Sequence, residues 1–135
     1  PTGTLMITTS RRTPKEALDI IVPLLAGGSH LLHRWDSDKD NPYLGLLGCA
    51  DAIIPTGDSL SMCTEACVSG KPVYVFAPEH AVPSKHKRLH QSLYDKSLAK
   101  PLDDQASLEW KPQNGLDDAG IVAEALRMRF PQISR

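Results

Sequence analysis

The sequence feature that most constrains the fold is a strand–helix–strand pattern in the middle of the chain. Residues 51–55 and 72–76 are short runs of mostly apolar residues, and the segment between them has helical spacing, with Gly57 before it and Gly70 after it. Apolar strands joined by a helix through short loops are typical of a parallel sheet that is covered on both faces. The pattern therefore predicts an α/β fold with a mostly parallel sheet, arranged as a three-layer sandwich with both faces of residues 51–55 buried.

The N-terminal part of the chain extends this alternation. We expect a strand over residues 4–9, a helix that ends near Gly27, a strand over residues 29–35, a polar turn over residues 36–42 and a short helix over residues 43–49. Thr13 is the expected cap of the first helix. Glu16 follows three residues later and would complete a capping box, with Pro14 at the first helical position.

The C-terminal part has a weaker pattern that ends in a clear helix. The sequence predicts a basic helix over residues 85–96, an edge strand over residues 98–102 and a loop over residues 107–114. Asp117 or Asp118 can cap a final helix that runs through Arg129. Its apolar residues available for packing are Ile121, Val122, Ala125, Leu126 and Phe130.

Composition limits the functional classes. The 135 residues fit one domain, and 15 Lys and Arg against 16 Asp and Glu give a net charge of −1, which argues against a general nucleic-acid-binding protein. No apolar run is long enough to span a bilayer, so membrane association is not indicated. Three cysteines without a Cys-x-x-Cys spacing suggest neither a disulfide framework nor a zinc site. A reducing, cytoplasmic location fits this composition best.

Three loops are expected to meet at the carboxyl ends of the strands, where doubly wound sheets bind their ligands. They are residues 10–12, residues 56–59, and residues 77–84 leading into the basic helix. Helix N-termini at this edge present free N–H groups to anions. Arg11 and Arg12 are either phosphate-binding guanidinium groups or a solvated turn. Lys85, Lys87 and Arg88 are likewise either an anion-facing cluster or a solvated helix face.

The loop of residues 56–59 is the most informative of the three. Gly57 permits close approach of a ligand to the backbone, and Ser59 with the first N–H groups of the helix can hold a diphosphate. Glu65 shares a helix side with Ser61 and Met62, away from the two cysteines of the same helix. Its carboxylate can accept hydrogen bonds from both hydroxyls of a ribose, although a lone glutamate on a helix is more often simply solvated.

Several motifs in sequence order resemble the donor site of GT-B glycosyltransferases. They are Asp51-Ala52-Ile53-Ile54, the run from Thr56 to Ala66, and Gly70-Lys71-Pro72-Val73. Together with Thr9-Ser10-Arg11-Arg12-Thr13-Pro14 and Asn41-Pro42-Tyr43, they resemble the mitochondrial-fission "elongated mitochondria" family, whose bacterial members are often labelled nucleoside-diphosphate-sugar epimerases. The resemblance extends from about Leu5 to Leu102.

The resemblance implies a Rossmann-like domain of the GT-B C-terminal type that binds a nucleotide-diphosphate sugar as substrate, with no cofactor and no metal. The chain would then be one donor-binding domain of a two-domain protein. The missing N-terminal domain would bind the acceptor and often supply the catalytic base, so the catalytic residues are unknown. His90 or Gln91 would contact the sugar or a phosphate. The full set of candidate ligand-binding residues is Ser10, Arg11, Arg12, Gly57, Asp58, Ser59, Ser61, Met62, Glu65, Lys87, Arg88, His90 and Gln91.

Other functions remain open at this point. A non-catalytic protein-interaction module can have the same fold, because fold does not fix function. An epimerase is disfavoured because no Gly-x-Gly-x-x-Gly turn follows the first strand and no Tyr-x-x-x-Lys pair is found. His86 and His90 have a spacing that can bind metal, but Lys87 and Arg88 between them would repel a dication.

Overall fold

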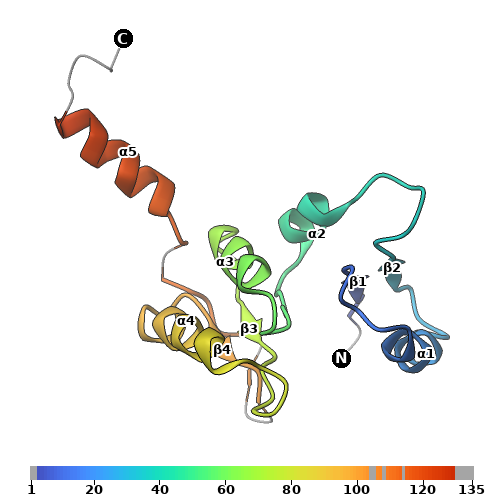
Figure 1. Ribbon diagram of the computed structural model, residues 1–135. Coiled ribbons are helices and arrows are strands. Elements are labelled where there is room, and N and C mark those ends of the chain that lie inside the picture. The colour runs from blue at the N-terminus through green and yellow to red at the C-terminus, as the bar shows by residue number, and fades with distance from the viewer. Residues whose placement is uncertain (1–2, 104–105, 108, 114, 130–135) are drawn as a thin grey trace. The chain divides into compact units, whose positions relative to one another are not determined.

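The computed structural model describes residues 3–103, 106–107, 109–113 and 115–129, and it divides the chain into two compact units. Unit 1 comprises residues 1–50 and unit 2 comprises residues 51–135. In unit 1 the elements are β1 (Met6–Thr8), α1 (Lys15–Leu24), β2 (Leu31–His33) and α2 (Tyr43–Cys49) (Figure 1). In unit 2 they are α3 (Leu60–Val68), β3 (Tyr74–Val75), α4 (Ser84–Asp95), β4 (Lys100–Pro101) and α5 (Asp118–Arg129).

Unit 1 contains a parallel βαβ arrangement. β1 and β2 pair in register from Met6 with Leu31 to Thr8 with His33, and α1 connects them. The ladder continues beyond the strands, because Thr9 N–H donates to the carbonyl of His33 at 3.0 Å. The predicted strand–helix–strand order is therefore confirmed, and α2 has the predicted bounds.

The predicted capping box at the start of α1 is wrong. The N-cap residue is Pro14, and no side chain caps the helix. The hydroxyl of Thr13 instead accepts from the N–H of Ser10 at 3.0 Å, while Thr13 N–H donates to the carbonyl of Ser10 at 2.9 Å. The threonine side chain thus closes the turn before the helix and is not available to the first helical amides.

Unit 2 contains two parallel crossovers that share β3. The bridges Ile53–Val73 and Thr56–Phe76 pair the segment before α3 with β3, and β4 pairs with the opposite edge of β3. Lys100 N–H donates to Val73 and Leu102 N–H donates to Val75, whereas Pro101 between them has no N–H and its nitrogen faces away from β3. The expected parallel α/β order is confirmed, and the described elements are those of a Rossmann-like α/β fold.

One face of this sheet carries the core. The buried apolar cluster consists of Cys63, Ala66, Cys67, Val73, Val75, Leu93, Leu98 and Ala99. Ile53 packs against this cluster, but its neighbour Ile54 is 52% exposed. The prediction that residues 51–55 are buried on both faces is therefore wrong at Ile54. Successive strand side chains point to opposite faces, and the face that carries Ile54 is covered at the fully buried Tyr74 but not at Ile54 itself.

After β4 the chain returns to the end of α3. The hydroxyl of the buried Tyr74 donates to the carbonyl of Ser107 at 2.5 Å, and the ring of Trp110 meets Tyr74 edge-on at 6.0 Å between centroids. The ammonium of Lys100 lies 5.1 Å from the centroid of Trp110. Leu116 then packs against the core cluster, and its N–H donates to the carbonyl of Cys67 at 3.1 Å. These contacts fasten this segment to β3, β4 and the C-terminal end of α3.

The final helix forms as predicted, but its apolar residues do not pack. The carboxylate of Asp117 accepts from Gly120 N–H at 2.8 Å, which confirms an aspartate cap. Ile121, Val122 and Leu126 are at least half exposed and Ala125 is also exposed, because Leu116 completes the core before the helix begins. Phe130 lies outside the described residues. In the described part of the chain, no helix has both the length and the apolar character needed to cross a membrane.

Candidate functional site

The centre of the candidate site is the turn of residues 56–59, called here the Gly57 turn. It leaves the sheet directly, since Gly57 N–H donates to the carbonyl of Phe76 at 2.8 Å. Ser59 is the N-cap residue of α3, but its hydroxyl lies 3.4 Å from that of Ser61 and makes no capping hydrogen bond. The first amides of α3 therefore point out of a helix that begins at the carboxyl end of a parallel strand, a geometry suited to an anion.

Gly57 is enclosed by two neighbours. A Cβ atom placed on it would lie 2.8 Å from the Cβ of Ala77 and 2.8 Å from Cε1 of His90. Both distances are shorter than carbon atoms tolerate, so this position requires glycine for packing as well as for any approach of a ligand. Ala77 follows β3 and His90 lies on α4, so the turn is held by two elements of unit 2.

Two histidines of α4, His86 and His90, face the Gly57 turn, and they are called here the histidine pair. Nδ1 of His86 lies 3.4 Å from the carbonyl oxygen of Gly57, and because that oxygen only accepts, Nδ1 carries the proton. His90 is 3% exposed, and its Nε2 has no hydrogen-bond partner. Burial lowers the pKa of His90, the neighbouring His86 lowers it further, and a hydrogen bond with the backbone of Gly57 opposes the shift. His90 is therefore neutral at pH 7.

The α3 helix separates an exposed polar side from a buried thiol side. Ser61 and Glu65 are exposed and Met62 is half-buried, whereas the two cysteines of this helix are buried. Burial raises the pKa of Cys63 to about 12 and that of Cys67 to about 11. The thiols therefore stay protonated at neutral pH and lack nucleophilic character. Glu65 therefore lies on the exposed side of α3.

On the exposed face of α4, the side chains of Lys87 and Gln91 interact with acidic side chains instead of with the Gly57 turn. The ammonium of Lys87 lies 3.7 Å from a carboxylate oxygen of Glu79, and both side chains are well exposed. The amide of Gln91 donates to Asp95 at 2.7 Å, one turn further along α4. Arg88 is exposed on the same helix. Of the four candidate residues on α4, the structure brings His90 to the turn and gives Lys87 and Gln91 acidic partners elsewhere.

The remaining candidates belong to unit 1. Ser10 accepts through its hydroxyl from the N–H of Arg12 at 3.2 Å, and the side chains of Arg11 and Arg12 are exposed. This loop lies beside the one that follows β2, because Trp35 N–H donates to the hydroxyl of Thr9 at 3.0 Å. The two loops thus share one edge of the β1–β2 pair, as parallel strands require.

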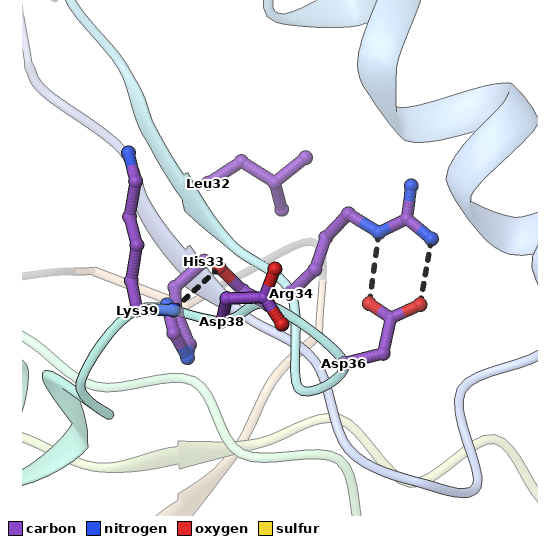
Figure 2. Close-up of a pocket in the computed structure, with 7 residues that line it drawn as sticks. Leu32, His33, Arg34, Asp36, Asp38 and Lys39 are labelled. Carbon is purple, nitrogen blue, oxygen red and sulfur yellow. Dashed lines mark hydrogen bonds and ion pairs between the residues drawn. The ribbon is translucent and has the colours of Figure 1, made fainter.

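A hollow that was not predicted from the sequence lies at the carboxyl end of β2 (Figure 2). Arg34 and Asp36 form a two-pronged ion pair there, with nitrogen–oxygen distances of 3.1 and 2.9 Å. This pairing lowers the pKa of Asp36. Because the pair is exposed and internally neutralised, it offers little net charge to a ligand. The hollow is lined by Leu32, His33, Arg34, Asp36, Ser37, Asp38 and Lys39.

The chemistry available at the Gly57 turn is that of binding. Over the described residues, no three His, Cys, Asp or Glu side chains gather where they could hold a metal ion. The turn instead combines the first amides of α3 with the buried imidazole of His90, and Glu65 is an exposed carboxylate on the helix that follows; such groups bind phosphates and hydroxyls. His86 was considered from sequence only as a metal ligand, and its i, i+4 spacing with His90 was the signal that both side chains share one face of α4.

The parallel strands, the crossover helices and the helix start at the carboxyl edge define a mixed α/β protein of the Rossmann-like class. Within that class, the family model for mitochondrial fission ELM1 matches residues 2–130. The chain therefore belongs to the mitochondrial fission ELM1 family. This agrees with the family that the sequence motifs resemble.

Two relatives extend this comparison. An uncharacterized protein of Rickettsia prowazekii (strain Madrid E) is 35% identical over 127 residues, which cover 90% of this chain and 35% of that protein. The mitochondrial fission protein ELM1 of Arabidopsis thaliana is 40% identical over 78 residues, which cover 58% of this chain and 18% of that protein. The chain thus spans about a third or less of either relative. No solved structure matches it.

Proposed function

We propose that this chain binds a nucleotide-diphosphate sugar at the Gly57 turn, as the donor-binding half of a GT-B-like glycosyltransferase. The observation that carries the proposal is the start of α3 at the carboxyl end of a parallel strand, with its first amides not capped by Ser59. A diphosphate accepts hydrogen bonds from such amides and is favoured by the helix dipole. The motif resemblance to GT-B donor sites supports the same ligand.

The proposed binding mode follows the order of groups along α3. The diphosphate lies on the amides that follow Gly57, Asp58 and Ser59, and the ribose hydroxyls bind the carboxylate of Glu65. Ser61 and Met62 lie between these two positions, and the helix rises by about 9 Å from Ser59 to Glu65.

The rest of the catalytic apparatus is assigned to the remainder of a longer protein. The chain spans 35% of the rickettsial relative, so a second domain that binds the acceptor and supplies the catalytic base is part of the proposal. Transfer needs no resident cofactor in this scheme, because amides and basic side chains stabilise the leaving diphosphate. The three free cysteines, two of them buried, support a reducing, cytoplasmic location.

Calorimetric titration with UDP, GDP, ADP and their sugar conjugates tests this function. We expect saturable binding of one base series, and a Glu65→Ala variant should weaken it by roughly 10- to 150-fold, the value of a hydrogen bond to a charged group. Glu124→Ala is the matched control, since Glu124 is an exposed helical glutamate on α5. The proposal is abandoned when a cooperatively folded chain binds none of these ligands.

A protein-interaction module is the second candidate function. It is favoured by the exposed apolar side chains of α5, among them Ile121 and Met128, which are 68% and 74% exposed. Large exposed apolar patches often mark interaction sites. The titration above separates the two candidates, because an interaction module has no need for nucleotide binding that depends on Glu65.

A further inference from the structure

The histidine pair joins the α4 helix to the candidate binding turn. His86 donates from Nδ1 to the Gly57 carbonyl, and His90 places Cε1 2.8 Å from the position that a Gly57 side chain would occupy. Both imidazoles therefore lie against Gly57, two residues before the N-cap residue Ser59 of α3. A change of charge on either ring acts directly on the turn.

The buried nitrogen of His90 is an unsatisfied group. Nε2 has no hydrogen-bond partner although the residue is only 3% exposed. A buried polar atom without a partner destabilises the ligand-free state. The unprotonated ring nitrogen of such an imidazole can accept a proton.

The charges around His90 are few. His86 faces it from the preceding turn of α4, and Asp58 lies in the Gly57 turn, where its charge acts on Cys63 of α3. The thiol of Cys63 and the phenol of Tyr94 have raised pKa values and remain neutral near pH 7. Ala77, which follows β3, contributes no charge. Among the described residues, the ionisable neighbour whose charge acts on His90 is His86, and that charge disfavours the imidazolium form of His90.

We propose that binding of a nucleotide-diphosphate sugar at the Gly57 turn is coupled to the uptake of one proton by His90. The inference rests on the proposed function. A diphosphate at the start of α3 brings negative charge close to Gly57, against which both imidazoles lie. The proton comes from solvent and goes to the unprotonated ring nitrogen, so the positive charge of the imidazolium offsets part of the charge of the ligand.

The coupling has a definite direction. An anion beside an imidazole raises its pKa, so the bound-state pKa of His90 lies above the free-state value, which is itself below the ordinary 6.5. As pH falls through the bound-state pKa, affinity rises by up to about tenfold per pH unit, and it levels off below the free-state pKa. The effect belongs to the range between about pH 5 and 7.5.

Calorimetry with UDP-glucose and GDP-mannose in two buffers of different ionisation enthalpy tests the coupling. Both phosphates of these probes are esterified, so the ligand itself takes up no proton in this range. We expect a binding heat that depends on the buffer at pH 6.5, with the sign of net proton uptake. His90→Gln should remove this dependence, whereas His30→Gln in unit 1 should retain it because glutamine can still accept from Leu5 N–H.

Histidine ring signals in nuclear magnetic resonance provide a second measurement on the unmodified chain. Addition of the sugar nucleotide should raise the pH at which the His90 ring titrates, and the amide signals of Gly57 and Ser59 should follow the same titration. Binding with equal heats in both buffers and an unmoved His90 titration overturns the coupling and leaves the proposed function standing. Absence of any binding overturns both, so the two failures are distinguishable.

Discussion

Gly57 shows how a single position can be fixed by its neighbours. From sequence, this glycine is interpreted as a place where a ligand approaches the backbone. The structure adds that Ala77 and His90 already occupy the space that a side chain would need. The residue therefore serves the packing of unit 2 whether or not a ligand is bound.

Substitution of Gly57 by alanine tests this packing. Gly57→Ala should lower the free energy of unfolding by about 1–3 kcal/mol, because the added methyl group meets two carbon atoms at 2.8 Å. Denaturant unfolding followed by circular dichroism measures the change. The control is Gly45→Ala, since nothing lies within 4 Å of that position in α2, and alanine there should be neutral or stabilising by about 0.5–1 kcal/mol. Equal effects of the two variants would contradict the packing account.

Among the helices and strands, α5 has the clearest local stabilising contact, which is its N-terminal cap. Asp117 accepts from Gly120 N–H, and α5 has little packing to support it, because its apolar side chains are exposed. Asp117→Ala should therefore destabilise α5 by about 1 kcal/mol, visible as faster amide hydrogen exchange over residues 118–122. Asp118→Ala is the matched control and should have a smaller effect. A larger effect of Asp118→Ala would show that helix-dipole charge, rather than the cap, dominates.

The order and type of the elements could be predicted because they depend on local patterns. The helix at residues 43–49 and the parallel crossovers follow from spacing and from punctuation by Gly and Pro. The role of Thr13 could not be predicted, since its hydroxyl can bind either the N–H of Ser10 or the first amides of α1, and both lie within three residues. The exposure of Ile54 depends on which face of the strand is covered. That choice is made by tertiary packing and leaves no local signal.

The candidate site could be predicted in part. Local sequence was enough to place Gly57, Ser59 and Glu65 on one turn and one helix. The contact of His86 and His90 with Gly57 joins residues about 30 positions apart, so it depends on how α4 packs and not on any local pattern. The contacts of Lys87 with Glu79 and of Gln91 with Asp95 were also not predicted, because several acidic side chains lie nearby.

For the whole molecule, the distribution of buried side chains is uneven. The buried apolar cluster lies entirely within unit 2, whereas His33 is the one buried residue among the described residues of unit 1. Burial of apolar surface is the main favourable term in folding. Burial of apolar side chains within the unit therefore contributes more to the stability of unit 2 than to that of unit 1.

Separate expression of the two units tests this difference. Residues 51–135 should unfold cooperatively in denaturant, and residues 1–50 should show no cooperative transition, since a small segment with little buried surface is marginal. Circular dichroism and urea titration of each segment provide the comparison with the whole chain. A non-cooperative transition of residues 51–135 would mean that the core of unit 2 depends on unit 1.

Pro101 has a consequence for how molecules of this protein meet one another. Its nitrogen, which faces away from β3, has no hydrogen to donate, and the neighbouring Lys100 is exposed. An incoming strand from a second molecule would find a ring methylene where its carbonyl needs a donor, and a positive charge beside it. Proline and lysine on an outer strand discourage such additive pairing. The sheet of unit 2 is thereby protected on this side against growth into aggregates.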